Sequence, residues 1–155
     1  MLPTVTTRFI EKIIRSGRLT EARHRCEKGE AAACSGNFDS QSCWSLVCEE
    51  VIDTDHNPSV YDAVYAELIR RGFQPDEIDT MRRLAWKTAG WMNYDMMVWD
   101  WVGLDEDDMR KALEWQLEKR KIRKDEHEIG LAAIQKGLDQ EAAARRAGER
   151  EGDLA

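Results

Sequence analysis

Hydrophobic residues recur along this chain at spacings of three and four, which places them on one side of an α-helix. No stretch shows the sustained alternation of hydrophobic and polar residues that is typical of a half-buried strand. The clearest stripes are Phe9-Ile10-Ile13-Ile14, Trp44-Val47-Cys48-Val51, Val60-Val64-Leu68, Ile78-Met81-Leu84-Ala85 and Met109-Ala112-Leu113-Leu117. The pattern therefore predicts an all-α protein.

Capping residues predict where several of these helices begin and end. Thr6 or Thr7 is a good N-cap for the first helix, and Gly17 is a natural stop. We expect a second helix from a cap at Thr20 towards Gly36. If the turn at residues 36–40 folds this helix against the third one, the two form a hairpin. Proline followed by two acids predicts a helix start at residues 74–77, and the acids at 105–108 predict another.

The stripes suggest two parts, a bundle of about six helices over residues 1–117 and a charged helical arm over residues 118–155. Between residues 118 and 128, Ile122 is the only apolar side chain. A second apolar patch at Ile129, Ile134 and Leu138 is therefore separated from the main stripes, and it must fold back, dimerise or bind another protein. We expect the arm to bind a partner and to be dispensable for folding of the bundle.

Tryptophan and methionine are concentrated in one block. Its members are Trp86, Trp91, Met92, Tyr94, Met96, Met97, Trp99, Trp101 and Trp115. We predict a short helix at residues 94–102, capped by Asn93. A helix that is apolar nearly all round is more often interior, so burial is the first expectation. The functional hypothesis is that part of the block docks a partner, since Trp, Tyr and Met are enriched at interface cores. The candidate partner-binding residues are Trp91, Trp99, Trp101, Ile129, Ile134 and Leu138.

Charge narrows the class of partner. The formal net charge is −7, and residues 37–80 hold two Lys/Arg against ten Asp/Glu. A basic or apolar partner surface is the natural complement. Residues 61–86 loosely resemble a helix-turn-helix, with Arg82, Arg83 and Lys87 on its second helix. Because phosphate binding depends on Lys and Arg, the surrounding acids argue against nucleic acid.

Four cysteines fall within 23 residues and invite a metal hypothesis. The candidate ligands are Cys26, Cys34, Cys43, Cys48, His24 and His56. Cys26 and Cys34 would lie about 12 Å apart along one helix, and Cys43 and Cys48 would point about 140° apart, so one tetrahedral site is excluded. Two nested disulfides, Cys34–Cys43 and Cys26–Cys48, remain an alternative in an oxidising compartment. We expect buried free thiols and no metal or cofactor.

No catalytic constellation stands out. The sequence Asp53-Thr54-Asp55-His56-Asn57 resembles the start of an EF-hand loop, but Pro58 and Val64 occupy the positions of the required glycine and glutamate. Gly-rich phosphate loops and the HExxH, GxSxG and CxxC motifs are absent from the sequence. No apolar run has signal-peptide or membrane-spanning length, so we expect a cytoplasmic protein that does not enter a membrane.

These observations favour a non-enzymatic interaction protein, such as an adaptor, inhibitor, assembly subunit or small regulator. It would bind another protein, or a second copy of itself, through the Trp/Met block and the C-terminal arm. The alternative is a helical ligand- or metal-binding domain, with or without enzymatic activity, that uses the Cys/His region or an aromatic pocket.

Overall fold

The computed structural model describes residues 6–31, 36–52, 56–97 and 103–154. Every regular element in these residues is helical, so the predicted all-α class is confirmed. The elements are α1 (Thr7–Ser16), α2 (Arg18–Glu27), α3 (Cys43–Cys48), α4 (Pro58–Arg70), α5 (Pro75–Ala85), the π-helix η1 (Trp86–Asp95), α6 (Glu106–Glu118) and α7 (Lys124–Asp153).

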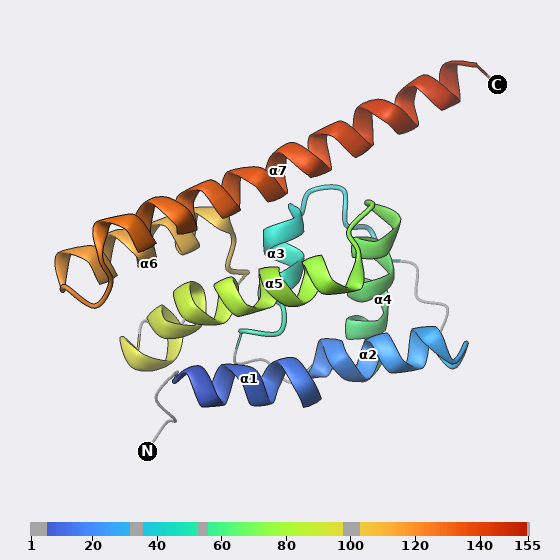
Figure 1. Ribbon diagram of the computed structural model, residues 1–155. Helices are drawn as coiled ribbons and strands as arrows, with labels where there is room; N and C mark the ends of the chain where they lie inside the picture. Colours follow the sequence, from blue (N-terminus) through green and yellow to red (C-terminus); the bar gives the residue numbers. More distant parts are fainter. Residues whose placement is uncertain (1–5, 32–35, 53–55, 98–102, 155) are drawn as a thin grey trace.

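The helices pack in layers around one core (Figure 1). Helices α1 and α2 run end to end along one side, α7 crosses the opposite side, and α5 lies between them. Helix α3 contacts α4, α5 and α7, while α6 packs on both η1 and α7. The largest fully buried side chains are Trp44, Arg82, Tyr61, Phe73, Leu19, Leu46, Leu68, Ile78, Met92, Leu104, Met109 and Ile134.

Local capping chemistry sets several helix ends where the sequence predicts them. The Thr6 hydroxyl accepts a hydrogen bond from the Phe9 backbone N–H, and Gly17 ends α1. Helix α5 begins with a capping box between Gln74 and Glu77, and α6 begins with one between Asp105 and Asp108. These ends are predictable because both partners lie within four residues of each other.

The second helix is shorter than predicted and pairs with a different neighbour. Gly29 adopts a left-handed φ of +71°, which few residues except glycine tolerate. The Gly29 N–H then bonds the Cys26 carbonyl and the next N–H bonds the Arg25 carbonyl, a Schellman motif that ends α2. Helix α2 packs on α4 rather than forming a hairpin with α3, and Arg25 pairs there with Asp62 at 2.7 Å.

The Trp/Met block begins as a π-helix, so the predicted cap at Asn93 is wrong. Helix α5 continues into η1, where Asn93 is a buried interior residue rather than a helix start. Glycine at position 90 leaves room for the Trp86 ring, because a Cβ there would lie only 2.9 Å from that ring. Trp86 stacks on Tyr94 with ring centroids 5.8 Å apart. Met96 and Met97 follow η1 and are not helical, and residues 98–102 of the predicted helix lie outside the described residues.

The first half of α7 belongs to the core. Its buried residues, Gly130, Ile134, Gly137 and Glu141, recur at the spacing of one helix face. The two glycines let α7 approach closely, because a Cβ on Gly130 would lie 2.9 Å from the Leu113 side chain. Ile134 is fully buried, in the same cluster as Trp44 and Leu113. The apolar patch of the arm therefore folds back on the bundle, one of the three outcomes that the sequence allows.

Packing does not follow the predicted boundary between residues 117 and 118. Helix α7 contacts both α3 and α6, and one core runs through all of them. Removing residues 118–155 would uncover Trp44 and Leu113, which now meet α7. Independent folding of residues 1–117 stays a prediction, but this contact argues against it.

Trp44 fixes the position of α7 most directly. Its side chain is 2% exposed, and its Nε1–H donates a hydrogen bond of 2.9 Å to the Ile134 carbonyl. A Cβ on Gly137 would lie 2.8 Å from the same Nε1 atom and 2.9 Å from the ring carbon Cζ2. Glycine at position 137 is therefore a packing requirement, although glycine weakens helices.

We predict that Gly137→Ala lowers stability, against the usual effect of this change. In a helix interior, alanine is favoured over glycine by about 1 kcal/mol. At position 137 the new methyl group meets the buried indole, and such overpacking costs about 1–3 kcal/mol. The thermal unfolding midpoint should fall by several degrees.

Gly148→Ala is the matched control, because a Cβ there meets nothing within 4 Å. It should raise the helical signal in circular dichroism without lowering the unfolding midpoint. If both substitutions stabilise the protein equally, α7 does not pack against Trp44 as described.

Candidate functional site

The structure does not gather the predicted partner-binding residues into one surface. Trp91 is buried on η1 and Ile134 in the core, while Leu138 is half-buried on α7. Among the four members that the structure describes, Ile129 has an exposed side chain, at 67% exposure. Trp99 and Trp101 lie outside the described residues. Trp91 and Ile134 therefore belong to the core of this fold, and a role for them in partner binding stays a prediction.

The predicted Cys/His candidates are also dispersed. Cys26, Cys43 and Cys48 are free thiols, and Cys34 lies outside the described residues. Burial raises the pKa of the Cys43 thiol to about 12, so this cysteine stays protonated at neutral pH. His24 is exposed, whereas His56 Nε2 lies 3.1 Å from a Glu49 carboxylate oxygen. Among the described residues, no group of three or more His, Cys, Asp or Glu could hold a metal ion.

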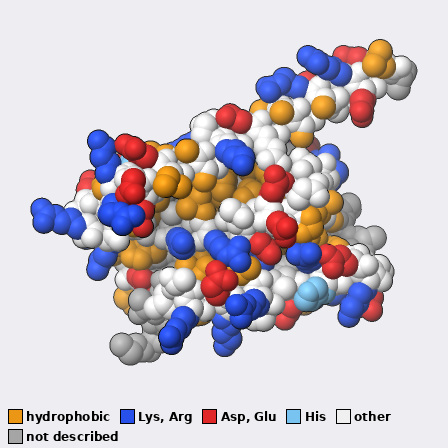
Figure 2. All heavy atoms as spheres, viewed as in Figure 1, with side chains coloured by type: hydrophobic (Ala, Val, Ile, Leu, Met, Phe, Trp, Pro, Cys, Tyr) orange, Lys and Arg blue, Asp and Glu red, His pale blue; other side chains and the backbone are white. Residues whose placement is uncertain are grey.

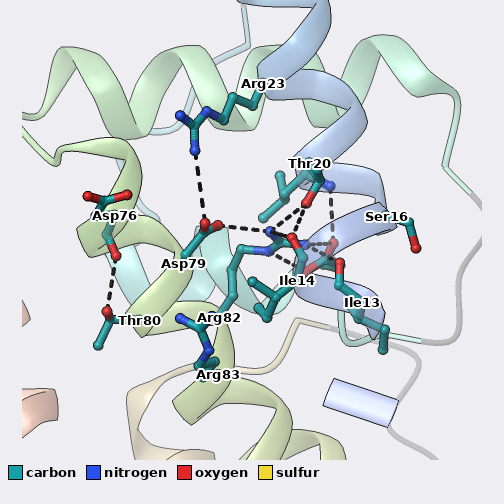
Figure 3. A network of polar contacts seen from close by, with 12 residues as sticks. Ile13, Ile14, Ser16, Thr20, Arg23, Asp76, Asp79, Thr80, Arg82 and Arg83 are labelled. Atoms are coloured by element: carbon teal, nitrogen blue, oxygen red, sulfur yellow. Dashed lines mark hydrogen bonds and ion pairs between the residues drawn. The ribbon is translucent and has the colours of Figure 1, made fainter. Parts of the chain in front are cut away.

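The densest polar cluster surrounds the guanidinium of Arg82, which lies between Asp79 and the end of α1 (Figure 3). Arg82 forms a buried ion pair with Glu50. The Arg82 side chain is 1% exposed and that of Glu50 is 2% exposed. Arg82 Nε donates to Glu50 Oε2 at 2.8 Å, and its terminal nitrogen Nη2 donates to Oε1 at 2.7 Å. This two-point contact joins α5 to the segment that follows α3.

The guanidinium also closes the C-terminal end of α1. Arg82 Nη2 donates to the Ile13 carbonyl at 2.9 Å, and Nη1 donates to the Thr20 hydroxyl at 2.8 Å and to Asp79 at 3.0 Å. Carbonyls at a helix end have no partner within the helix and attract positive charge. Arg82 therefore satisfies groups that the short α1–α2 joint would otherwise leave unpaired.

At the start of α2, the carboxylate of Glu50 accepts a hydrogen bond from a free backbone N–H group, as Arg82 donates to free carbonyls at the end of α1. Its Oε1 accepts the Leu19 backbone N–H at 3.1 Å, and its Oε2 accepts the Trp86 indole N–H at 3.3 Å. Free N–H groups at a helix start favour a negative charge. Gly17 lies so close to this cluster that a side chain would not fit, since a Cβ there would lie 2.5 Å from Glu50 Oε1.

This cluster is built for stability rather than for chemistry. Burial acts to lower the pKa of Arg82, but the hydrogen bond and charge of Glu50, with those of Asp79, outweigh burial and leave that pKa raised. Each donor of Arg82 has an acceptor, and each oxygen of Glu50 accepts two hydrogen bonds. Because its side chain is buried, Arg82 cannot contact nucleic acid as the helix-turn-helix hypothesis requires.

A second buried cluster anchors α7 near its middle. Arg71 pairs with Glu141 of α7, and its Nε donates to Glu67 at 2.7 Å. The same guanidinium donates to the carbonyls of Gln41 and Phe38, at 2.7 and 2.8 Å. Arg71 therefore ties α4, the segment before α3 and α7 together. Glu141 is the last buried residue of α7.

Beyond this anchor α7 leaves the bundle. Residues 145–153 are all exposed and helical, and Figure 1 shows that end of α7 extending past the other helices. We call residues 145–153 the projecting segment. A hollow of about 560 Å³ lies at its base, lined by Asp39, Arg70, Arg71, Glu141, Ala144, Arg145, Gly148 and Glu149.

No family model, curated protein or solved structure matches this chain. In the described part of the chain, no helix combines the length and the apolar character that spanning a membrane requires. Geometry and surface chemistry therefore carry the functional argument.

Sequence reasoning missed Glu50, Arg71 and Glu141, although a signal existed for Arg82. Arg82 follows Ile78 by four residues and precedes Ala85 by three, so it occupies a position in an apolar stripe. A charged residue at such a position indicates a buried and paired side chain. Its partner could not be identified from sequence, because Glu50 lies 32 residues away.

We predict strong coupling between Arg82 and Glu50. Arg82→Met alone leaves a buried carboxylate without its cation, which costs about 3–5 kcal/mol. Glu50→Gln in the same chain removes that charge while keeping an acceptor for the Leu19 N–H. The double variant should therefore unfold at a higher urea concentration than Arg82→Met alone.

A double-mutant cycle in urea measures this coupling. The Arg83→Met variant is the control, because Arg83 makes a half-exposed pair with Glu11 and solvent-exposed pairs contribute little to stability. Additive effects of the Glu50 and Arg82 substitutions would show that the pair does not act as a unit.

Proposed function

We propose that this chain is a non-enzymatic interaction protein that docks another protein through the outward surface of α7, centred on the projecting segment. The observation that carries the proposal is the change in packing along one continuous helix. Up to Glu141 the helix covers the core, and every residue from 145 to 154 is exposed.

A helical segment of this kind gains little from the bundle itself. Isolated helices shorter than about 12–15 residues are marginal in water, so the projecting segment depends on the packed half for its start. Contact with a second surface would stabilise it further. A helix that presents one face to a groove is a common mode of protein recognition.

The projecting segment has the composition of a docking helix with a polar rim. It carries three arginines and three acids, so its own charge is balanced. Ala147 of the projecting segment falls on one side of the helix with Ala143 before it and Leu154 after it, at spacings of four and seven. Leu154 is 89% exposed. Small side chains allow a partner backbone to come close, which favours an apolar helical surface as the complement. Ile129 extends the exposed apolar side chains to the other end of α7.

Site-specific photo-cross-linking in the native host tests this function. A photoreactive amino acid at Ala147 should give one discrete product, either with a defined protein or with a second copy of this chain. The same amino acid at Glu114 is the control, since Glu114 is exposed on α6. The product should be formed only from position 147.

Removing residues 145–155 should abolish the interaction and leave the fold intact, because the Arg71–Glu141 pair is retained. Near-ultraviolet circular dichroism of the shortened chain should match that of the full chain. If positions 147 and 114 give the same products, or if neither gives any, the projecting segment is not a docking element.

A further inference from the structure

Helix α1 carries a stripe of positive charge on its outer side. Arg8, Lys12 and Arg15 are exposed and lie at spacings of four and three, so they line one face over about 10 Å. Ile10 and Ile14 occupy the opposite, buried face. The three cations, together with Thr7, Glu11 and Ser16, line a shallow hollow of about 570 Å³.

Two cations from the α5–η1 helix extend this stripe sideways. Arg83 Nε lies 3.0 Å from Glu11 Oε1, which holds α5 alongside α1. The hydrogen bond from Arg83 lowers the pKa of Glu11, and the charges of Arg83, Arg15 and Lys87 lower it further. Arg15 and Lys87 therefore both act on the same carboxylate. Five cations surround one acid, and we call this set the α1 basic surface: Arg8, Glu11, Lys12, Arg15, Arg83 and Lys87.

The α1 basic surface contrasts with the rest of the molecule. Five positive charges against one negative charge give it a local charge of +4, in a chain whose formal net charge is −7. Figure 2 shows Lys and Arg side chains gathered over α1 and the adjoining part of α5. When positive charges are concentrated on one part of an otherwise acidic protein, they attract a negatively charged partner to that part.

We propose that the α1 basic surface docks an acidic segment of a partner protein. This surface is separate from α7, so the proposal does not depend on what the projecting segment binds. A short acidic helix matches the stripe, because glutamates at spacings of four and three would face Arg8, Lys12 and Arg15 in order.

Two other anionic partners fit less well. Nucleic acid presents a long array of phosphates, and the acidic remainder of this protein would repel all but the part at α1. A membrane-surface helix inserts bulky apolar side chains beside its cations. On α1 the bulky apolar residues Phe9, Ile10, Ile13 and Ile14 pack on the core instead.

Binding of a designed probe tests the proposal. The probe is a fluorescent helical peptide of about 14 residues with three glutamates at the stripe spacing, and fluorescence anisotropy of the full chain with it gives Kd. Lys12→Glu with Arg15→Glu should weaken binding by about tenfold or more. Lys119→Glu with Lys121→Glu changes the net charge equally at exposed positions elsewhere, and it should have less than about a twofold effect.

Glu11→Gln changes the charge of the α1 basic surface in the opposite direction, because it removes a negative charge. Removing the single acid of the α1 basic surface should strengthen binding by about two- to threefold, and this gain should shrink between about 50 and 300 mM salt. Circular dichroism confirms that each variant is folded.

Three results would overturn the proposal. Equal weakening by the two charge-reversed pairs would mean that the peptide senses net charge only. Binding to duplex DNA or to phosphatidylserine vesicles that is tighter than to the peptide, and lost with Lys12 and Arg15, would assign this surface to phosphate groups. Loss of self-association in the Lys12/Arg15 variant, without peptide binding by the native chain, would assign it to a second copy.

Discussion

The Glu50–Arg82 ion pair is the interaction on which the arrangement of the other helices depends. Removing two charges from water is favourable only when every hydrogen-bonding group is matched. Here the match comes from the ends of α1 and α2, from Asp79 and from Trp86. The pair therefore requires α1, α2, α5, η1 and the segment after α3 to meet at one point. A non-polar pair could fill the same space, but it would leave the helix ends at the α1–α2 joint unsatisfied.

The second constraint is the close contact between α7 and Trp44. Gly130 and Gly137 remove the side chains that would separate the helices, and the indole then bonds a carbonyl of α7 itself. Arg71 and Glu141 mark where this contact ends. One helix consequently has two environments, a packed part that completes the core and an exposed end, the projecting segment. The proposed docking function rests on this division.

Local features of the fold were predictable from sequence, and long-range ones were not. Apolar stripes and caps involve residues within a few positions, so the all-α class and the starts of α5 and α6 follow from pattern alone. Gly29 is a residue type that commonly ends a helix, so the end of α2 had a signal in the sequence. The apolar pattern instead led to a predicted helix that continues towards Gly36. The long-range partners, Glu50 for Arg82 and Glu141 for Arg71, lie 32 and 70 residues away, beyond any local signal. Ile134 was correctly read as part of an apolar patch, but only the structure shows that Trp44 covers it.

Hydrogen exchange along α7, followed by nuclear magnetic resonance, tests the central claim most directly. Backbone amides in the part of α7 that packs on the core, residues 131–141, should exchange only through global unfolding, with the slowest rates of the chain. Amides at residues 147–153 should exchange far faster, because nothing in the bundle covers them. A sharp decrease in protection just after Glu141 is the expected result. Equal protection along the whole helix, or fast exchange at residues 131–141, would contradict the division of α7 into a packed part and the projecting segment.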